Sequence, residues 1–107
     1  MNFLYDNLYG KKMTEFGQQD VLQLTIEKAT SLVACDINGA SDPYVKVRLN
    51  NSFERKTQIR TRTLNPVWNE IINFYAIYTG KTELNLKFEV YDWDRFTKDV
   101  SFQTTVQ

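Results

Sequence analysis

Two stretches of this sequence each carry a pair of aspartates beside a predicted β-strand. Asp36 and Asp42 lie in DINGASDPYVKV, and Asp92 and Asp94 lie in VYDWDR. If both turns lie at the same end of a sandwich of strands, the carboxylates converge, and each like-charged pair at ~4 Å repels by about 1 kcal/mol in water and by more inside a protein. A divalent cation removes that cost. Oxygen ligands on turns, in a chain with no histidine and a single cysteine, suit Ca²⁺ better than a transition metal.

Each aspartate also has an ordinary structural explanation, because Asp is common in turns, where its side chain hydrogen-bonds the nearby backbone. For Asp36 and Asp42 alone that explanation is the stronger one. Asp92 and Asp94 change the balance, since an acid-x-acid pair after a buried strand places both side chains on one side of the loop. The four acids together therefore favour a metal site.

The elements that would position these turns are predicted to be short β-strands. Apolar and polar residues alternate in LQLTIE, YVKVRL and LNLKFEVY, and a period of two is typical of half-buried strands. The stretch VWNEIINFYAIY, rich in aromatic and β-branched residues, predicts a further strand. With no sustained helical period, residues 21–107 are expected to form an all-β antiparallel Greek-key sandwich. Residues 1–20 are expected to be an N-terminal extension, either a tail or an added strand.

A basic block follows the first acidic turn. Between Tyr44 and Arg62 there are six basic residues and one acid, Glu54, although the formal net charge of the chain is zero, which argues against non-specific nucleic-acid binding. Alternation up to Arg62 predicts a second strand that pairs with Tyr44–Leu49 through a three-residue turn. The predicted cationic patch comprises Tyr44, Lys46, Arg48, Lys56, Arg60 and Arg62. A solvated sheet face is the simpler alternative.

The stretches SDPYVKV, KTQIRTRTLNPVWNE and FEVYDWDRFTKD occur in the order and spacing of the C2 domain. The sequence from Val21 to Asp99 thus resembles the calcium-dependent phospholipid-binding module of conventional protein kinase C and the synaptotagmins. The resemblance implies Ca²⁺ ligation by the carboxylates of the four acids, with backbone carbonyls completing the shell. The implied ligands are Asp36, Asp42, Asp92 and Asp94, and the carbonyls are those of Ile37 and Trp93.

The sequence departs from the family pattern near its end. The family's fifth acid falls at Val100, and Asp99 lies one position earlier. Either the loop adjusts so that Asp99 serves, or the site lacks one carboxylate and holds fewer ions more weakly. Similar domains also continue into further strands, so we expect the sandwich to lack at least one of them. Either Phe3–Tyr9 fills the open edge, or a second copy of the chain pairs with it to form a homodimer.

By the same resemblance the partner is an anionic phospholipid surface, with phosphatidylserine as the expected lipid. Ile37 and Phe96 would insert at the loop tips, with Arg95 at headgroup level. Tyr44, Lys46, Lys56 and Trp93 match positions that bind phosphoinositide headgroups in some members, but Glu54 stands where a lysine would be expected, so phosphoinositide selectivity is left open.

Other features bear on location and on the class of function. No apolar run approaches the ~18 residues of a membrane span, no signal peptide is evident, and Cys35 cannot form an internal disulfide. A cytoplasmic protein that associates peripherally with membranes on a calcium rise is therefore expected. A Ca²⁺-independent protein-interaction domain is the alternative. An enzyme is disfavoured because the chain has no histidine and no activated nucleophile.

Overall fold

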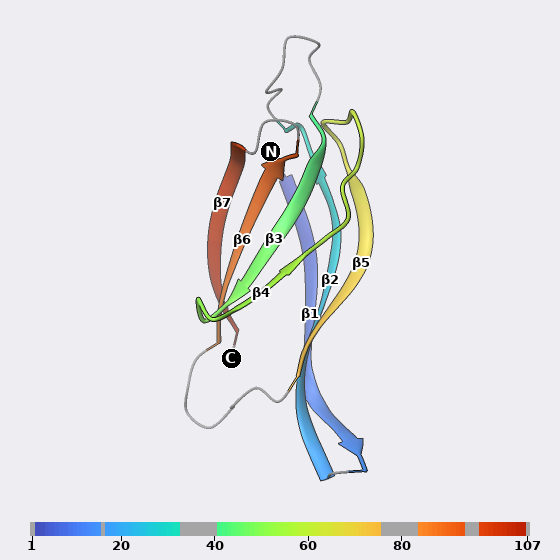
Figure 1. The fold of residues 1–107 in the computed structure, drawn as a ribbon, viewed down its shortest axis with the longest axis vertical. Coiled ribbons are helices and arrows are strands. Elements are labelled where there is room, and N and C mark those ends of the chain that lie inside the picture. The colour runs from blue at the N-terminus through green and yellow to red at the C-terminus, as the bar shows by residue number, and fades with distance from the viewer. Residues whose placement is uncertain (1, 16, 33–40, 76–83, 94–96, 107) are drawn as a thin grey trace.

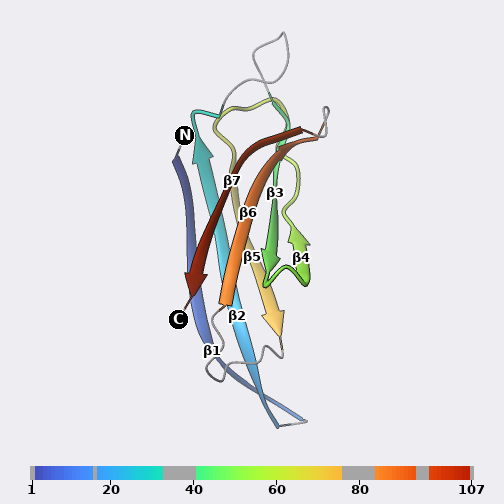
Figure 2. The ribbon, with the colours of Figure 1, turned by 90° about the vertical axis from the view of Figure 1, so that its left-hand side faces the viewer.

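The computed structural model describes residues 2–15, 17–32, 41–75, 84–93 and 97–106 (Figure 1). This described part of the chain contains β-strands and no helix. The strands are β1 (Asn2–Thr14), β2 (Gly17–Thr30), β3 (Pro43–Leu49), β4 (Phe53–Lys56), β5 (Val67–Tyr75), β6 (Leu84–Asp92) and β7 (Thr97–Val106). They form two antiparallel sheets, ordered β1-β2-β5 and β4-β3-β6-β7. Figure 2 shows the sheets as two layers. The predicted all-β antiparallel sandwich is confirmed. In the described residues no helix is long and apolar enough to cross a membrane.

The core is made by the alternate residues that the sequence pattern predicts. Leu22, Leu24 and Ile26 of β2 are fully buried and face the apolar residues of β3 and β6. Between those two strands, Val45 pairs with Val90 in the ladder, so successive inward side chains stack in rows. Each such side chain contributes roughly 1.5–3 kcal/mol on burial, and these rows hold the strand ends in place.

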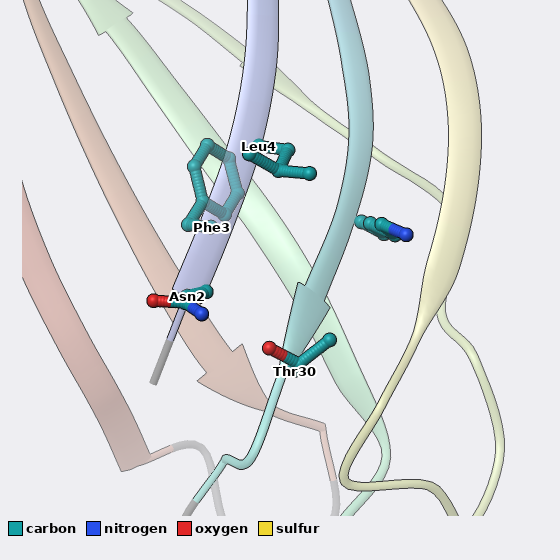
Figure 3. A pocket seen from close by; sticks show the side chains of 5 residues that line it. Asn2, Phe3, Leu4 and Thr30 are labelled. Carbon is teal, nitrogen blue, oxygen red and sulfur yellow. The ribbon is translucent and has the colours of Figure 1, made fainter.

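The first strand, β1, pairs with β2 along its whole length and lies at the edge of its sheet. The rings of Phe3 and Tyr5 pack on Phe88 of the opposite sheet, with centroid distances of 5.5 Å and 4.5 Å. Beyond the sandwich, the β1–β2 hairpin continues as a projecting arm (Figures 1 and 2). Near the start of β1, a hollow of about 380 Å³ is lined by Asn2, Phe3, Leu4, Lys28 and Thr30 (Figure 3).

A tight turn joins β3 to β4. Asn50 and Asn51 both have positive φ, 53° and 60°, and the Ser52 amide donates to the Leu49 carbonyl at 3.0 Å. Asparagine tolerates this left-handed conformation, and two such residues in succession match the twist of a hairpin. The predicted three-residue connection is therefore present.

The prediction that this second strand continues to Arg62 is wrong, because β4 ends at Lys56. Thr57 turns inward, where its hydroxyl accepts the Val45 amide at 2.8 Å in place of a ladder carbonyl. Arg62 then has a positive φ of 50°, which breaks the extended chain. Residues 57–66, the crossing segment, thus lead from one sheet to the other.

Candidate functional site

Neighbouring strand ends bring Asp42 and Asp92 together. Pro43 and Asp92 are register partners in the β3–β6 ladder, so Asp42 lies just outside the pair. The Asp42 amide donates to Oδ1 of Asp92 at 3.2 Å, and the Trp93 amide donates to the Asp42 carbonyl at 2.9 Å. Asp92 is 1% exposed, whereas Asp42 is half-buried. Two of the four predicted acids therefore share one edge of the sandwich.

The crossing segment fixes the Asp42 carboxylate. Its Oδ1 accepts the backbone amide of Arg62 at 2.6 Å, a contact that the left-handed conformation of Arg62 makes available. The same segment runs alongside the start of β3, where the Arg60 amide donates to the Pro43 carbonyl at 3.0 Å. Backbone geometry thus orients this side chain, whatever side chain residue 62 carries.

Three consecutive residues of the crossing segment hold the described residues on either side of the stretch 33–40, which includes Asp36. The Thr63 amide donates to the Ser41 carbonyl at 2.8 Å, and the Leu64 carbonyl accepts the Leu32 amide at 3.0 Å. Asn65 Oδ1 accepts the Ser31 amide, also at 3.0 Å. We call Thr63, Leu64 and Asn65 the clasp, because they tie the end of β2 to the residues just before β3.

Several predicted site residues lie outside the described residues: Asp36, Ile37, Asp94, Arg95 and Phe96. The backbone of Asp99 is described, and it lies at a register irregularity of the β6–β7 ladder. Val90 pairs with Val100 and Tyr91 pairs with Lys98, so Asp99 is the extra residue of a bulge. Bulges redirect side chains at strand ends. The one-residue displacement of this acid in the sequence thus coincides with an extra residue in the strand.

The donor chemistry of the described part of the site suits a hard cation. It comprises the carboxylates of Asp42 and Asp92, and the backbone of Trp93 lies next to them. Carboxylate and carbonyl oxygens are the ligands that Ca²⁺ prefers. Among described residues no group of three His, Cys, Asp or Glu could hold a metal ion, so a complete ligand set needs Asp36 or Asp94. The chemistry of these ligand groups therefore fits Ca²⁺.

The outward residues of β3, β4 and β6 form the cationic face, which comprises Lys46, Arg48, Glu54, Lys56, Lys87 and Glu89. Lys46 is the register partner of both Lys56 and Glu89. Its ammonium lies 4.6 Å from the centre of the Tyr91 ring, and that ring stacks on Tyr44. The structure therefore brings together Lys46, Lys56, Arg48 and Tyr44 of the predicted patch.

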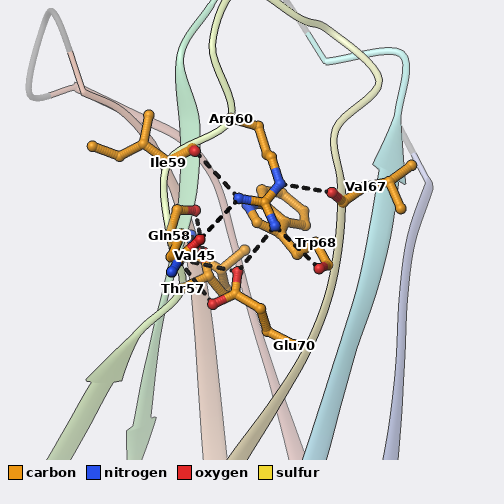
Figure 4. A network of polar contacts seen from close by, with 8 residues as sticks. All are labelled: Val45, Thr57, Gln58, Ile59, Arg60, Val67, Trp68 and Glu70. Atoms are coloured by element: carbon orange, nitrogen blue, oxygen red, sulfur yellow. Dashed lines mark hydrogen bonds and ion pairs between the residues drawn. The ribbon is translucent and has the colours of Figure 1, made fainter.

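Arg60 lies outside the cationic face and has a structural role. Its Nε donates to the Val67 carbonyl at 2.8 Å and its Nη2 to the Trp68 carbonyl at 3.2 Å, with Glu70 Oε2 3.7 Å from Nη2 (Figure 4). These contacts join the crossing segment to the start of β5. Arg62 follows at the edge near Asp42. Because β4 ends early, neither arginine shares the face of Lys46 and Lys56.

Two members of the cationic face, Lys87 and Glu89, were missed by sequence reasoning. Glu89 is 3% exposed, and its Oε2 accepts a hydrogen bond from the Tyr91 hydroxyl at 3.2 Å. Burial raises the pKa of Tyr91, and the charge of Glu89 raises it further. The alternation in LNLKFEVY already placed both missed residues outward, but it gave no sign that large neighbours would cover Glu89.

Comparisons with known proteins find similar sequences and similar folds. A family model described as "C2 domain" matches residues 20–106. Synaptotagmin-1 of Caenorhabditis elegans is 41% identical over 83 residues, which are 76% of this chain and 19% of that protein. A C2 domain of plant extended synaptotagmin 1 superimposes with a TM-score of 0.65 at 28% identity, covering 80% of this chain and 66% of that one. A C2 domain of Drosophila RIM, at 18% identity, shares the fold with a TM-score of 0.69 and covers 98% and 96% of the two chains. The chain spans about a fifth of the length of the synaptotagmin.

Proposed function

Because this chain belongs to the C2 domain family, we propose that it is a non-enzymatic module that binds anionic phospholipid membranes when Ca²⁺ is present. The observation that carries the proposal is the junction of Asp42 and Asp92, where two carboxylates are oriented by backbone amides at one edge of the sandwich. Like charges on neighbouring strand ends repel, and a cation bound between them removes that repulsion.

The calcium ligands we propose extend beyond this pair. Asp36 and Asp94 supply further carboxylates, the carbonyls of Ile37 and Trp93 complete the shell, and Asp99 takes the place of the family's fifth acid. Ca²⁺ accepts six to eight oxygen ligands, so coordination positions remain for lipid phosphate oxygens. The bound ion also reverses the charge of the edge, which makes it attractive to anionic lipid.

Side chains around the ion add to membrane binding. Ile37 and Phe96 insert into the acyl region, which contributes roughly 1.5–3 kcal/mol each, and Arg95 lies among the headgroups. Each lysine of the cationic face that reaches an anionic surface adds about 1 kcal/mol. Phosphatidylserine is the lipid we propose as the main partner, at the cytoplasmic face of a membrane.

Vesicle sedimentation tests the proposal. The chain should sediment with phosphatidylcholine vesicles containing phosphatidylserine in Ca²⁺, and should stay in the supernatant in chelator or with phosphatidylcholine alone. Asp92→Asn, which keeps the side-chain size but removes a ligand charge, should abolish sedimentation. Asp6→Asn is the matched control, because it removes one exposed carboxylate on β1, outside the site. Binding that is indifferent to Ca²⁺, or that persists in Asp92→Asn, would contradict the proposal.

A protein-interaction role is the second candidate, and a specific surface favours it. The outer face of the β1-β2-β5 sheet exposes Leu4, Leu8, Val67 and Ile71 by 47–66%. In the ladders, Leu4, Lys28 and Val67 form one row across this face. A homodimer through the β1 edge belongs to this candidate. Sedimentation equilibrium distinguishes it, since a monomer at every concentration would exclude the homodimer.

A further inference from the structure

Arg48 lies at the centre of the charges on the cationic face. In the strand ladders its partners are Glu54 on β4 and Lys87 on β6. Its Nε donates to Glu54 Oε1 at 3.0 Å, and its Nη1 lies 4.0 Å from Glu89 Oε1. The hydrogen bond to Glu54 raises the pKa of the Arg48 guanidinium, and the charges of both carboxylates raise it further. The chain thus supplies this guanidinium with two anions of its own.

The two carboxylates differ in how easily they could leave Arg48. The side chain of Glu89 is 4% exposed and also accepts a hydrogen bond from the Tyr91 hydroxyl. Separating Glu89 from Arg48 would therefore leave a buried charge without its ion-pair partner. Glu54 is 38% exposed on β4, the edge strand, all of whose residues are exposed. Exposed ion pairs are weak, so an incoming anion can displace Glu54, although breaking the pair reduces the net affinity of that anion for Arg48.

The position of Glu54 is one that a phosphate group could occupy. Guanidinium groups bind phosphate with the same donors that they offer to a carboxylate. Lys46 and Lys56, which are register partners, stand on the same face two residues along their strands from the Arg48–Glu54 pair and could hold further phosphate charge.

We infer that Glu54 acts as a built-in competitor at Arg48, which limits the affinity of the cationic face for phosphomonoester groups such as those of a phosphoinositide headgroup. The inference rests on the proposed membrane function for its setting, but not on calcium. Glu54 is then the residue that determines how well this face distinguishes a phosphorylated headgroup from other anionic lipid.

The test uses Glu54→Gln in chelator, so that the calcium site does not contribute. Affinity for vesicles containing phosphatidylinositol 4,5-bisphosphate should rise about tenfold, because one negative charge is lost and Arg48 is released. Soluble inositol 1,4,5-trisphosphate separates headgroup recognition from adsorption to a surface, and its affinity should rise as well. Glu15→Gln makes the same change in net charge in the exposed β1–β2 turn and should leave both affinities within about twofold.

A second variant identifies the site of the gain. Adding Arg48→Gln to Glu54→Gln should remove the increase, since the two residues act as one pair. The inference is overturned if Glu54→Gln binds no better than Glu15→Gln, or if the increase survives the loss of Arg48. Thermal unfolding confirms that each variant is folded. A gain in chelator from a chain that ignores Ca²⁺ would support this inference and refute the proposed function, whereas calcium-dependent binding without the gain would do the reverse.

Discussion

Arg60 and Arg62 carry the same charge two positions apart, yet the fold uses them in different ways. The guanidinium of Arg60 serves the backbone of β5, while Arg62 contributes its amide to Asp42. Lys46 and Lys56, by contrast, have outward positions on paired strands. The basic residues of this chain therefore divide into structural and surface groups, and mutation should separate them.

Arg60→Ala should lower the free energy of unfolding by about 2 kcal/mol. The carbonyls of Val67 and Trp68 would lose a charged donor, and hydrogen bonds to charged groups are worth about 1.5–3 kcal/mol. Urea unfolding measures this loss. Vesicle binding of the folded fraction should stay unchanged, whereas Lys56→Ala should weaken binding and leave stability within about 0.5 kcal/mol. Weaker vesicle binding by folded Arg60→Ala would show that Arg60 belongs to the lipid surface after all.

Tyr91 makes the stability of the fold depend on pH at the alkaline end. Burial, with Glu89 nearby, raises the pKa of its phenol above the ordinary value of about 10. The neutral phenol is therefore favoured by folding, so its contribution to stability is complete below about pH 10 and is lost as the pH rises through the folded-state pKa. In Tyr91→Phe, stability should fall less steeply above about pH 10, as urea unfolding across this range would show. An equally steep fall in the variant would assign the alkaline loss to other groups, of which Tyr44, whose pKa burial also raises, is the first candidate.

At the scale of elements, the ends of the strands position the site residues, and hydrogen bonds from the crossing segment keep them in place. The clasp bonds the end of β2 and the residue that precedes Asp42 at the same time. It therefore holds the residues that precede and follow the stretch 33–40, which includes Asp36. Loosening the clasp should affect ion binding more than an equal loss of stability elsewhere.

Asn65→Ala tests this role by removing the acceptor of the Ser31 amide. Stability should fall by about 1 kcal/mol, and calcium affinity, measured by calorimetric titration, by about fivefold. Asn50→Ala is the matched control, because it removes a similar bond, in which the Asn85 amide donates to Asn50 Oδ1, at the opposite end of β3. It should cost at least as much stability and leave calcium affinity unchanged. Equal effects of the two variants on calcium affinity would mean that the clasp has only a structural role.

The same elements show what sequence reasoning can predict. Alternation identified the buried rows of β2, β3 and β6, because burial of one sheet face imposes a period of two. The junction of Asp42 and Asp92 followed once their strands were known to be neighbours. The path of residues 57–62 could not be predicted in this way, because the hydroxyl of Thr57 and the guanidinium of Arg60 bond to backbone groups that no sequence pattern identifies. The burial of Glu89 likewise depends on which side chains cover it.

At the scale of the whole molecule, two charged regions share one sheet. The proposed calcium site lies at the end of β3 and β6 where Asp42 meets Asp92, and the cationic face lies along the same strands. If the chain binds membranes at the calcium edge as proposed, Lys46 and Tyr91 come close to the headgroups. In this proposal the ion is the switch, and the cationic face adjusts the affinity.

The proposed bridge of Ca²⁺ between this chain and anionic lipid can be tested by thermodynamic linkage. If lipid completes the coordination of the ion, each ligand must raise the affinity for the other by the same factor. The measurement is the calcium affinity of the chain with and without phosphatidylserine vesicles. We expect the vesicles to tighten calcium binding by at least tenfold, and phosphatidylcholine vesicles to leave it unchanged. Calcium affinity that does not respond to phosphatidylserine would contradict the bridge.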